Sequence, residues 1–298
     1  MARKRIFIKR VNAQATTGNK QAIRSEIENM RSLDHQHIVK VVSCYQEPSG
    51  PSSANFYVLL HPSADNDLQN FLEETCNKAS SSDRELYISW INSWFQCLLS
   101  ALAYLHYQGI HHEDIKPANI VHCSHQIYFT DFSSSRKVTS WEETSTESPA
   151  AASRLFAAPE ALYDGTRRFR HGSETDVFSL GLVFVEMVTV MIGKNIDDLR
   201  SYLFDEANEP RQYHRVVHKI ATWFWRQETP ATRIFDKIVY YMLKQDRSKR
   251  FGAQETVDTL NQSGDLETLT GCECRFFRWE RRQPEIEMTD DEDLVIVN

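Results

Sequence analysis

The sequence is most informative at His112-Glu113-Asp114-Ile115-Lys116-Pro117-Ala118-Asn119, with Asp131-Phe132-Ser133 starting twelve residues after Asn119. The first segment holds a carboxylate that can accept a proton and, two positions later, a lysine. Its final asparagine and the aspartate that opens the second segment carry side-chain oxygens, which magnesium prefers as ligands. The two segments therefore supply a base, a cation and a metal-binding pair within twenty residues.

The chemistry suited to this set is transfer of a phosphoryl group from a nucleotide to a hydroxyl. That reaction requires the acceptor hydroxyl to be held in line, its proton to be taken up, and the charge on the phosphate oxygens to be neutralised. Asp114 is predicted to be the base, and Lys116 is predicted to contact the transferred phosphate. Asn119 and Asp131 are predicted to bind the metal ion.

At these residues the chain resembles the protein kinase family, whose catalytic loop reads HRD-x-K-P-x-N and whose magnesium loop reads DFG. Lys116-Pro117 resembles the serine/threonine kinases rather than the tyrosine kinases. A chance match is the simpler interpretation of an isolated DFx tripeptide, but two segments in this order and spacing argue against it. The match runs from about Ile6 to about Leu260, and parts of it resemble a group of fungal kinase-domain proteins.

The resemblance implies a two-lobed α+β fold, with a reduced β-rich N-lobe and a mainly helical C-lobe. Residues 1–60 are expected to form a partial N-lobe, residues 61–67 a hinge, and residues 68–279 the C-lobe. The acidic segment 280–298 is expected to be a disordered tail. The resemblance also implies ATP and Mg²⁺ as cofactors, and Ser/Thr hydroxyls of protein substrates as acceptors.

Short apolar or alternating runs predict the strands of this fold. Ile120-Val121-His122 and Gln126–Thr130 are expected to form a small hairpin that carries one metal ligand to the other. Val39–Tyr45 and Phe56–Leu60 are expected to complete the N-lobe sheet. A loop over Glu47–Ser53, rich in Pro and Ser, would join these last two strands.

The N-lobe is expected to hold the nucleotide phosphates with a lysine and a glutamate. Lys9, in the predicted strand Arg5–Val11, resembles the family's strand lysine that contacts the α- and β-phosphates. Apolar residues spaced three and four apart predict a helix over Ala22–Leu33. Glu26 on that helix is the expected partner of Lys9, in preference to Glu28 on the neighbouring face. An ordinary edge lysine and a solvated helix glutamate are the alternatives.

The segment after the second of these strands resembles the hinge between the kinase lobes. Leu60 is expected to lie beside the adenine, with backbone groups around His61 to Ser63 pairing with its edge. Pro62 has no amide hydrogen, so a donor must come from a neighbour. Asp67 is expected either to accept from the ribose hydroxyls or to cap the following helix, or to do both.

The C-lobe is expected to be built around a helix with one apolar stripe. Its residues are Ile91, Trp94, Phe95, Leu98, Leu102 and Leu105. Farther along, Asp176 resembles the family's aspartate that holds the backbone of the catalytic loop. Arg250 is expected to pair with Glu160 of the Ala158-Pro159-Glu160 motif. Both of these contacts would be structural.

Three departures from the family pattern bear on activity. No GxGxxG occurs and the sequence starts at the lysine strand, so we expect a reduced cover over the phosphates and weaker nucleotide binding. Glu113 replaces an arginine that would pair with an activation-loop phosphate, so modification of the nearby hydroxyls is not expected to activate the chain through that contact. Those hydroxyls are Thr144, Ser145, Thr146 and Ser148. Ser133 replaces a glycine, a change that looks tolerable because Asp131 keeps its oxygens.

These departures leave two interpretations of function open. The leading one is an ATP- and Mg²⁺-dependent kinase that phosphorylates Ser or Thr on proteins, in a sequence that is truncated before the lysine strand. The alternative is a catalytically weak or inactive pseudokinase that acts as a binding scaffold.

Composition sets further bounds on partners and location. The chain has 298 residues, of which 41% are hydrophobic and 25% charged, enough for one large domain or two unequal lobes. No membrane-length apolar run or leader is present, so an intracellular protein of the cytoplasm or nucleus is expected, without a membrane partner. The net charge of −7 argues against nucleic acid as the main partner. Nothing in the sequence indicates an oligomeric state.

The six cysteines show no framework spacing. Cys97 lies on the apolar face of a predicted helix and is expected to be a buried thiol. Cys272-Glu273-Cys274 is a weak metal-binding signal because no second pair with matching spacing accompanies it. An ordinary surface segment is therefore the preferred interpretation of this motif.

Overall fold

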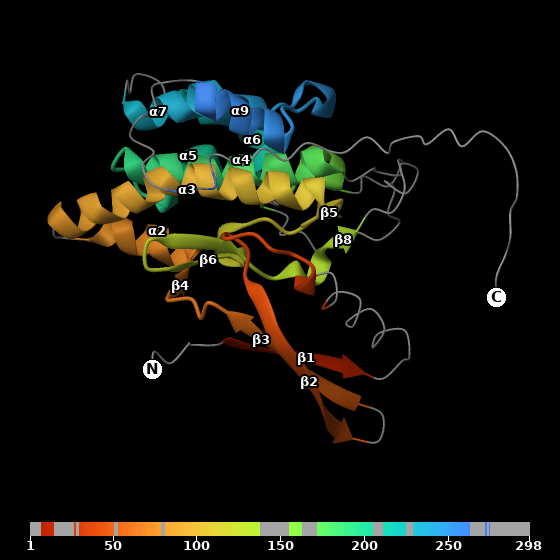
Figure 1. Ribbon diagram of the computed structural model, residues 1–298. Coiled ribbons are helices and arrows are strands. Elements are labelled where there is room, and N and C mark those ends of the chain that lie inside the picture. Colours follow the sequence, from red (N-terminus) through yellow and green to blue (C-terminus); the bar gives the residue numbers. More distant parts are fainter. Residues whose placement is uncertain are drawn as a thin grey trace, which may run out of the picture.

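The computed structural model describes residues 7–14, 27, 30–50, 53–78, 81–137, 155–162, 172–204, 211–224, 229–262, 272 and 274. A small antiparallel sheet forms one part of the molecule, and a larger, mainly helical part forms the other (Figure 1). This arrangement confirms the expected two-lobed α+β fold. None of the helices in these ranges is both long and apolar enough to cross a lipid bilayer.

The N-lobe sheet has the strand order β1-β3-β2, with β1 at Phe7–Gln14, β2 at Lys40–Gly50 and β3 at Ser53–His61. All neighbouring strands are antiparallel. The prediction of a loop over Glu47–Ser53 was wrong, because β2 continues to Gly50 and pairs with β3 along most of that length. Pro48 is tolerated there because β2 is an edge strand, which needs hydrogen bonds on one side only.

The helix predicted over Ala22–Leu33 is described at only a few positions. Residues 27, 30 and 31 are helical, and Ile27, Met30 and Leu33 are buried in the core. These three residues follow the predicted apolar stripe, so the part of the helix that the structure describes agrees with the periodicity. Ile23, which the same stripe includes, lies outside the described residues.

A second small sheet lies between the N-lobe sheet and the helices, in the order β4-β6-β7. Strand β4 covers Asn66–Asp67, β6 covers Ile120–Cys123 and β7 covers Gln126–Phe129. The antiparallel pairing of β6 with β7 confirms the predicted hairpin. A third pair joins β5 at Ile110–His111 to β8 at Arg136–Lys137.

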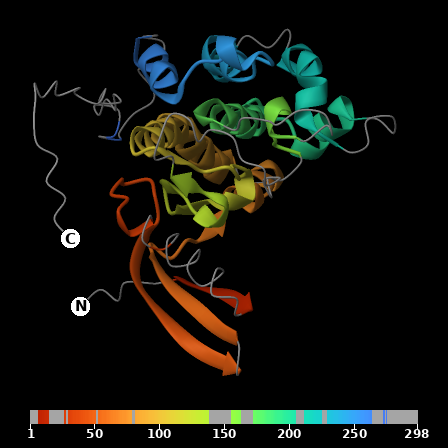
Figure 2. The ribbon, with the colours of Figure 1, turned by 90° about the vertical axis from the view of Figure 1, so that its right-hand side faces the viewer.

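The C-lobe is built from helices packed around a buried α4. Their bounds are α2 Leu68–Asn77, α3 Ser81–Tyr107, α4 Ser173–Met191, α5 Ile196–Leu203, α6 Tyr213–Phe224, α7 Pro230–Ile234, α8 Tyr240–Met242 and α9 Ala253–Gln262. Short 3-10 turns cover Pro117–Asn119, Phe132–Ser134, Pro159–Ala161 and Arg247–Lys249, and a π turn covers Phe235–Val239. In Figure 2 most of these helices lie above the β6–β7 hairpin, with the N-lobe sheet below it. The hairpin therefore lies at the junction of the two parts.

Hydrophobic burial explains why α3 is the longest helix in the described part of the chain. The six residues of its predicted stripe are completely buried, which confirms that prediction. Burial of such side chains contributes roughly 1.5 to 3 kcal/mol each, and this gain outweighs the weak helix propensity of the aromatic and β-branched members. The helix ends at Tyr107, five residues before His112, so it leads directly into the polar loop.

Candidate functional site

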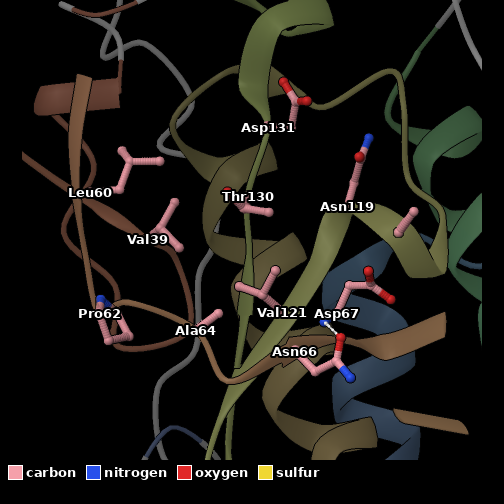
Figure 3. Close-up of a pocket in the computed structure, with 11 residues that line it drawn as sticks. Val39, Leu60, Pro62, Ala64, Asn66, Asp67, Asn119, Val121, Thr130 and Asp131 are labelled. Carbon is pink, nitrogen blue, oxygen red and sulfur yellow. Dashed lines mark hydrogen bonds between the residues drawn. The ribbon is translucent and has the colours of Figure 1, made fainter. Parts of the chain in front are cut away.

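A pocket of about 350 Å³ lies where the N-lobe sheet, the segment after β3 and the β6–β7 hairpin meet (Figure 3). Its lining residues are Val39, Leu60, Pro62, Ala64, Asn66, Asp67, Ala118, Asn119, Val121, Thr130 and Asp131. In Figure 3 the polar ends of Asn119 and Asp131 lie at one end of the pocket, and Leu60 and Pro62 lie at the other side. The pocket is therefore apolar on one side and rich in oxygen atoms at the opposite end.

Asp114, Lys116 and Asn119 form one hydrogen-bonded group beside this pocket. Lys116 Nζ donates to Asp114 Oδ2 over 2.8 Å. Asn119 Nδ2 donates to the same oxygen over 2.7 Å and to the Asp114 backbone carbonyl over 2.8 Å. Both bonds use the amide nitrogen of Asn119, so its Oδ1 is not committed to Asp114. The loop thus holds a largely buried carboxylate between an ammonium group and an amide.

The loop backbone is held by Asp176 near the start of α4. The Asp176 carboxylate accepts from the backbone N–H groups of His112 and Glu113, over 2.8 and 2.9 Å, and contacts His106 Nε2 over 3.0 Å. Burial by itself opposes ionisation of Asp176, but the hydrogen bond with His106 and the nearby histidines outweigh it and lower the pKa of Asp176. The predicted structural role of Asp176 is therefore confirmed.

His112 joins the loop to the hairpin that leads to Asp131. Its ring is completely buried, lies 4.9 Å from the Phe132 ring between centroids, and contacts the Thr130 carbonyl through Nε2 over 3.1 Å. Burial lowers the pKa of His112, although Asp176 and the Thr130 carbonyl favour the protonated form. A neutral ring whose Nε2–H donates to Thr130 therefore fixes the distance between the two predicted metal-binding segments.

Two residues of the site adopt a backbone conformation that is uncommon outside glycine. Asp131 has φ of 58° and Glu113 has φ of 62°, both in the left-handed region. Short polar side chains tolerate this region better than most, which suits Asp131. Ser133 lies in a 3-10 turn and is not among the described residues with positive φ. In this conformation the position does not need the freedom of the family's glycine.

The hinge residues are distributed around the pocket. Leu60 and Pro62 line it, as does Ala64, whereas His61 and Ser63 alternate with them and do not belong to the lining. The chain leaves β3 at His61 and bends at Pro62, so these side chains lie along the edge of the pocket rather than in a continuing strand. The predicted contacts of His61 and Ser63 with a nucleotide involve their backbone groups and stay a prediction.

Asp67 lies at the pocket and also caps a helix. Its Oδ1 accepts from the backbone N–H of Asn70 over 2.8 Å, and its Oδ2 accepts from the Asn70 amide group over 2.8 Å. It is therefore the N-cap of α2, one of the two roles expected from the sequence. Each oxygen keeps a further lone pair, because an ionised carboxylate accepts about four hydrogen bonds.

The predicted phosphate clamp is described only in part. Lys9 lies in β1 opposite Val58 of β3, as the strand prediction required. The side chain of Lys9 and all of Glu26 lie outside the described residues. The same holds for the candidate modification sites Thr144 and Ser145 and for the acidic segment 280–298.

Several lining residues had no predicted role in the site, among them Val39, Val121 and Thr130. Val121 lies in β6, which begins directly after the 3-10 turn that ends at Asn119, so the two residues reach the same pocket from adjoining elements. Val39 reaches the pocket because its backbone N–H donates to the Phe129 carbonyl over 3.1 Å. No local sequence pattern predicts that contact, because Phe129 is ninety residues away from Val39 in the chain.

The second predicted structural contact is also present. Arg250, which is buried, donates from Nη1 to Glu160 Oε1 and from Nη2 to Glu160 Oε2, the latter over 3.2 Å. Arg250 Nη1 also donates to the backbone carbonyl of Glu174 over 2.7 Å. This forked contact ties the Pro159–Ala161 turn to the start of α4 and confirms the predicted pair.

Comparison with known proteins agrees with this geometry. The family model described as protein kinase domain matches residues 1–260. A calcium/calmodulin-dependent protein kinase kinase of Caenorhabditis elegans is 30% identical over 169 residues, covering 56% of this chain and 29% of that protein. Calcium/calmodulin-dependent protein kinases of Metarhizium anisopliae and Emericella nidulans are 21% and 24% identical, covering 87% and 85% of this chain and 62% and 55% of their own length.

This chain therefore spans less than two thirds of the length of these three relatives. The family match nevertheless covers most of the chain, including the polar loop that ends at Asn119 and the segment that begins at Asp131. The fold, the buried Asp176 beneath the polar loop and the Glu160–Arg250 pair agree with that match. The chain belongs to the protein kinase family.

Proposed function

We propose that this chain transfers the γ-phosphoryl group of ATP to Ser or Thr hydroxyls of protein substrates, with Mg²⁺. One observation carries the proposal: Asn119 binds Asp114 through its nitrogen while lining, together with Asp131, a pocket of about 350 Å³. This single arrangement joins a base to a pair of metal-binding oxygens.

The pocket fits the nucleotide that the proposal requires. Val39 and Leu60 offer apolar surface for a flat ring system, and Val121 offers more from the hairpin. The remaining lone pairs of Asp67 are available to ribose hydroxyls near the start of α2. The cavity volume falls within the range of about 300 to 1,000 Å³ that is usual for small-molecule sites.

The donor set fits Mg²⁺. Asn119 contributes a neutral amide oxygen and Asp131 an anionic carboxylate, and a hard cation prefers such ligands while keeping several of its waters. Asp131 and Asn119 both line the pocket, and Figure 3 shows their polar ends in the same part of it. When bound, the metal would neutralise charge on the transferred phosphoryl group.

The loop supplies the proton chemistry. Asp114 would accept the proton of the substrate hydroxyl as that oxygen bonds to the γ-phosphorus and the bond between this phosphorus and the ADP oxygen breaks. Lys116, already 2.8 Å from Asp114, would pair with the phosphoryl oxygens as negative charge develops on them. Asp176 would keep both groups in place through the loop backbone.

One further observation supports the acceptor class. The lysine at position 116, followed by proline, resembles serine/threonine kinases, and proteins of Dictyostelium discoideum and Arabidopsis thaliana whose names include serine/threonine-protein kinase also match the chain. The proposed acceptor is an intracellular protein.

The test is transfer of radiolabelled phosphate from ATP to a generic basic protein, with Asp131→Asn as the blank. We expect the native chain to exceed the blank by at least about 100-fold, because the variant weakens the charge that holds the metal. Asp198→Asn, an exposed position on α5, is the matched control and should keep native activity.

Nucleotide binding separates the kinase from the scaffold interpretation. Fluorescent ATP analogues should bind the native chain more tightly with Mg²⁺ than without it, and Asp131→Asn should lose that difference. Mg²⁺-dependent binding with no transfer above the blank would contradict the proposed activity and would favour the binding scaffold.

A further inference from the structure

Four side chains that can ligate a metal meet beside α3 and β7, and the proposed kinase chemistry uses none of them. They are His37, Cys97, Cys272 and Cys274, and their ligand atoms all lie within 4.8 Å of one another. They come from the segment before β2, from α3 and from two described positions near the C-terminal end of the chain. We propose that these four residues bind a structural zinc ion.

The sulfur separations suit ligands of one metal and not a disulfide. Cys97 Sγ and Cys274 Sγ are 4.0 Å apart, whereas a disulfide bond is about 2.05 Å long. Two thiolates bound to one tetrahedral zinc at about 2.3 Å lie roughly 3.8 Å apart. None of the cysteines of the described residues forms a disulfide, so the thiols of this cluster can act as ligands.

The orientation of His37 is set as metal-binding histidines require. Its Nδ1 contacts the Ile127 carbonyl over 2.8 Å. A carbonyl only accepts, so Nδ1 carries the proton and Nε2 carries the lone pair. Nε2 is the atom that faces the thiols, 3.0 Å from Cys272 Sγ. A backbone carbonyl on the outer ring nitrogen is the usual way in which a protein fixes a histidine for a metal.

Hydrogen bonds also position the two C-terminal cysteines. Gln36 Nε2 donates to Cys272 Sγ over 2.9 Å, a contact that favours a negatively charged sulfur. Ser100, one turn after Cys97 on α3, donates from Oγ to the Cys274 carbonyl over 3.2 Å. Cys274 is completely buried and Cys97 is 3% exposed, so the cluster is largely closed to solvent.

The ligand set selects zinc in a structural role. Three thiolates and one imidazole are a Cys₃His set, which in proteins binds Zn²⁺ tetrahedrally. Four protein ligands leave no open position for water or substrate, so the site would not be catalytic. The surface interpretation of Cys272-Glu273-Cys274 is therefore wrong for Cys274, and the second half of the ligand set comes from residues far away in the sequence.

A zinc ion here would brace the hairpin that carries Asp131. His37 accepts from the Phe129 N–H through its backbone over 2.9 Å and contacts Ile127 through its ring, so it binds β7 twice. Helix α3, which carries Cys97, packs against the same strand (Figure 1). The ion would thereby join the C-terminal cysteines, α3 and β7 into one rigid unit two residues before Asp131.

The first measurement is the metal content of the full chain, purified in reducing buffer without chelators. Mass spectrometry of the elements should find about one zinc per chain in the native protein and less than a tenth of that in Cys274→Ser. Cys76→Ser is the matched control, because Cys76 is a partly buried thiol outside the cluster that contacts the Lys194 carbonyl. It should keep its full zinc content.

Cobalt substitution keeps the proposal testable if a serine variant fails to fold. Native protein exchanged with Co²⁺ should show the visible bands of tetrahedral cobalt and near-ultraviolet absorption from cobalt–thiolate bonds. Cys272→His retains four ligands and should bind cobalt with about a third less of the thiolate absorption. The proposal would be overturned if the native protein contained no zinc and showed no tetrahedral spectrum after addition of Co²⁺. A disulfide between Cys97 and Cys274 in the native protein would overturn it as well.

Discussion

The two polar clusters of this molecule differ in how the chain assembles them. Asp114, Asn119 and Asp131 lie within eighteen residues, joined by one loop and one hairpin. The cluster of His37, Cys97 and the two C-terminal cysteines spans well over two hundred residues and three separate segments. The first is held by local hydrogen bonds and strand pairing, whereas the second exists only once α3, β7 and the C-terminal segment have packed together.

Because of this difference, we expect substitutions in the two clusters to affect different properties of the protein. A cluster made by one loop and its hairpin loses its reactive group on substitution but keeps its surroundings, because Asp176 and His112 hold the backbone independently. A cluster made by three segments loses the contacts between them. Substitutions should therefore affect activity alone in the first cluster and affect thermal stability in the second.

The largest expected effect is on turnover in the local cluster. Asp114→Asn should lower kcat by about 10² to 10⁴-fold, the usual contribution of a general base. Nucleotide affinity and Tm should stay close to native, because Asn119 and Asp131 keep their positions. Steady-state kinetics, nucleotide titration and thermal melting check the three parts separately. A large loss of Tm would show that the loop depends on the Asp114 hydrogen bonds for its fold.

The next effect is the loss of metal from the distant cluster. If the free zinc concentration is about 1,000 times the Kd, removing the ion lowers the free energy of unfolding by roughly 4 kcal/mol. This corresponds to a fall of about 10 °C in Tm for a chain of this size. Melting in the presence of a strong chelator, without nucleotide, measures the shift. Added Zn²⁺ should restore the native Tm and added Mg²⁺ should not. An unchanged Tm on chelation would remove the proposed stabilising role.

The smallest effect concerns pH and the buried ring of His112, which supports the local cluster from outside it. Burial lowers the pKa of His112 in the folded state, so the unfolded chain binds a proton more readily as pH falls below about 6.5. The stability associated with the neutral ring is present above that pH and is lost as pH falls toward the lowered value. His112→Gln cannot take up this proton and should reduce the loss.

Urea unfolding between pH 5 and pH 8 measures this effect. The slopes of the unfolding free energy against pH should differ between the native chain and His112→Gln by at most about 1.4 kcal/mol per pH unit, the limit for one proton. The carboxylates of Asp176, Asp114 and Asp131 all favour the protonated ring, which reduces the difference. Parallel slopes would show that the ring takes up its proton equally in both states.

Prediction from residue patterns succeeded where partners lie close together in the chain, while the family resemblance supplied the distant contacts of Asp176 with the loop and of Arg250 with Glu160. The β6–β7 hairpin and the stripe on α3 were both correct, because periodicity and residue spacing report local geometry. It failed for β2, whose extension to Gly50 depends on pairing with β3 and overrides the local preference of Pro48 for a loop. It also failed for Cys274, whose partners are distant.

The primary structure was enough to indicate the kinase family and to propose the catalytic groups, because those residues carry their chemistry at short, fixed spacings. Folding alone brought Val39 into the pocket and gathered three cysteines around His37. The reason is physical: side-chain type and short-range spacing are properties of the chain, whereas a four-ligand site spread over three segments depends on how helices and strands pack.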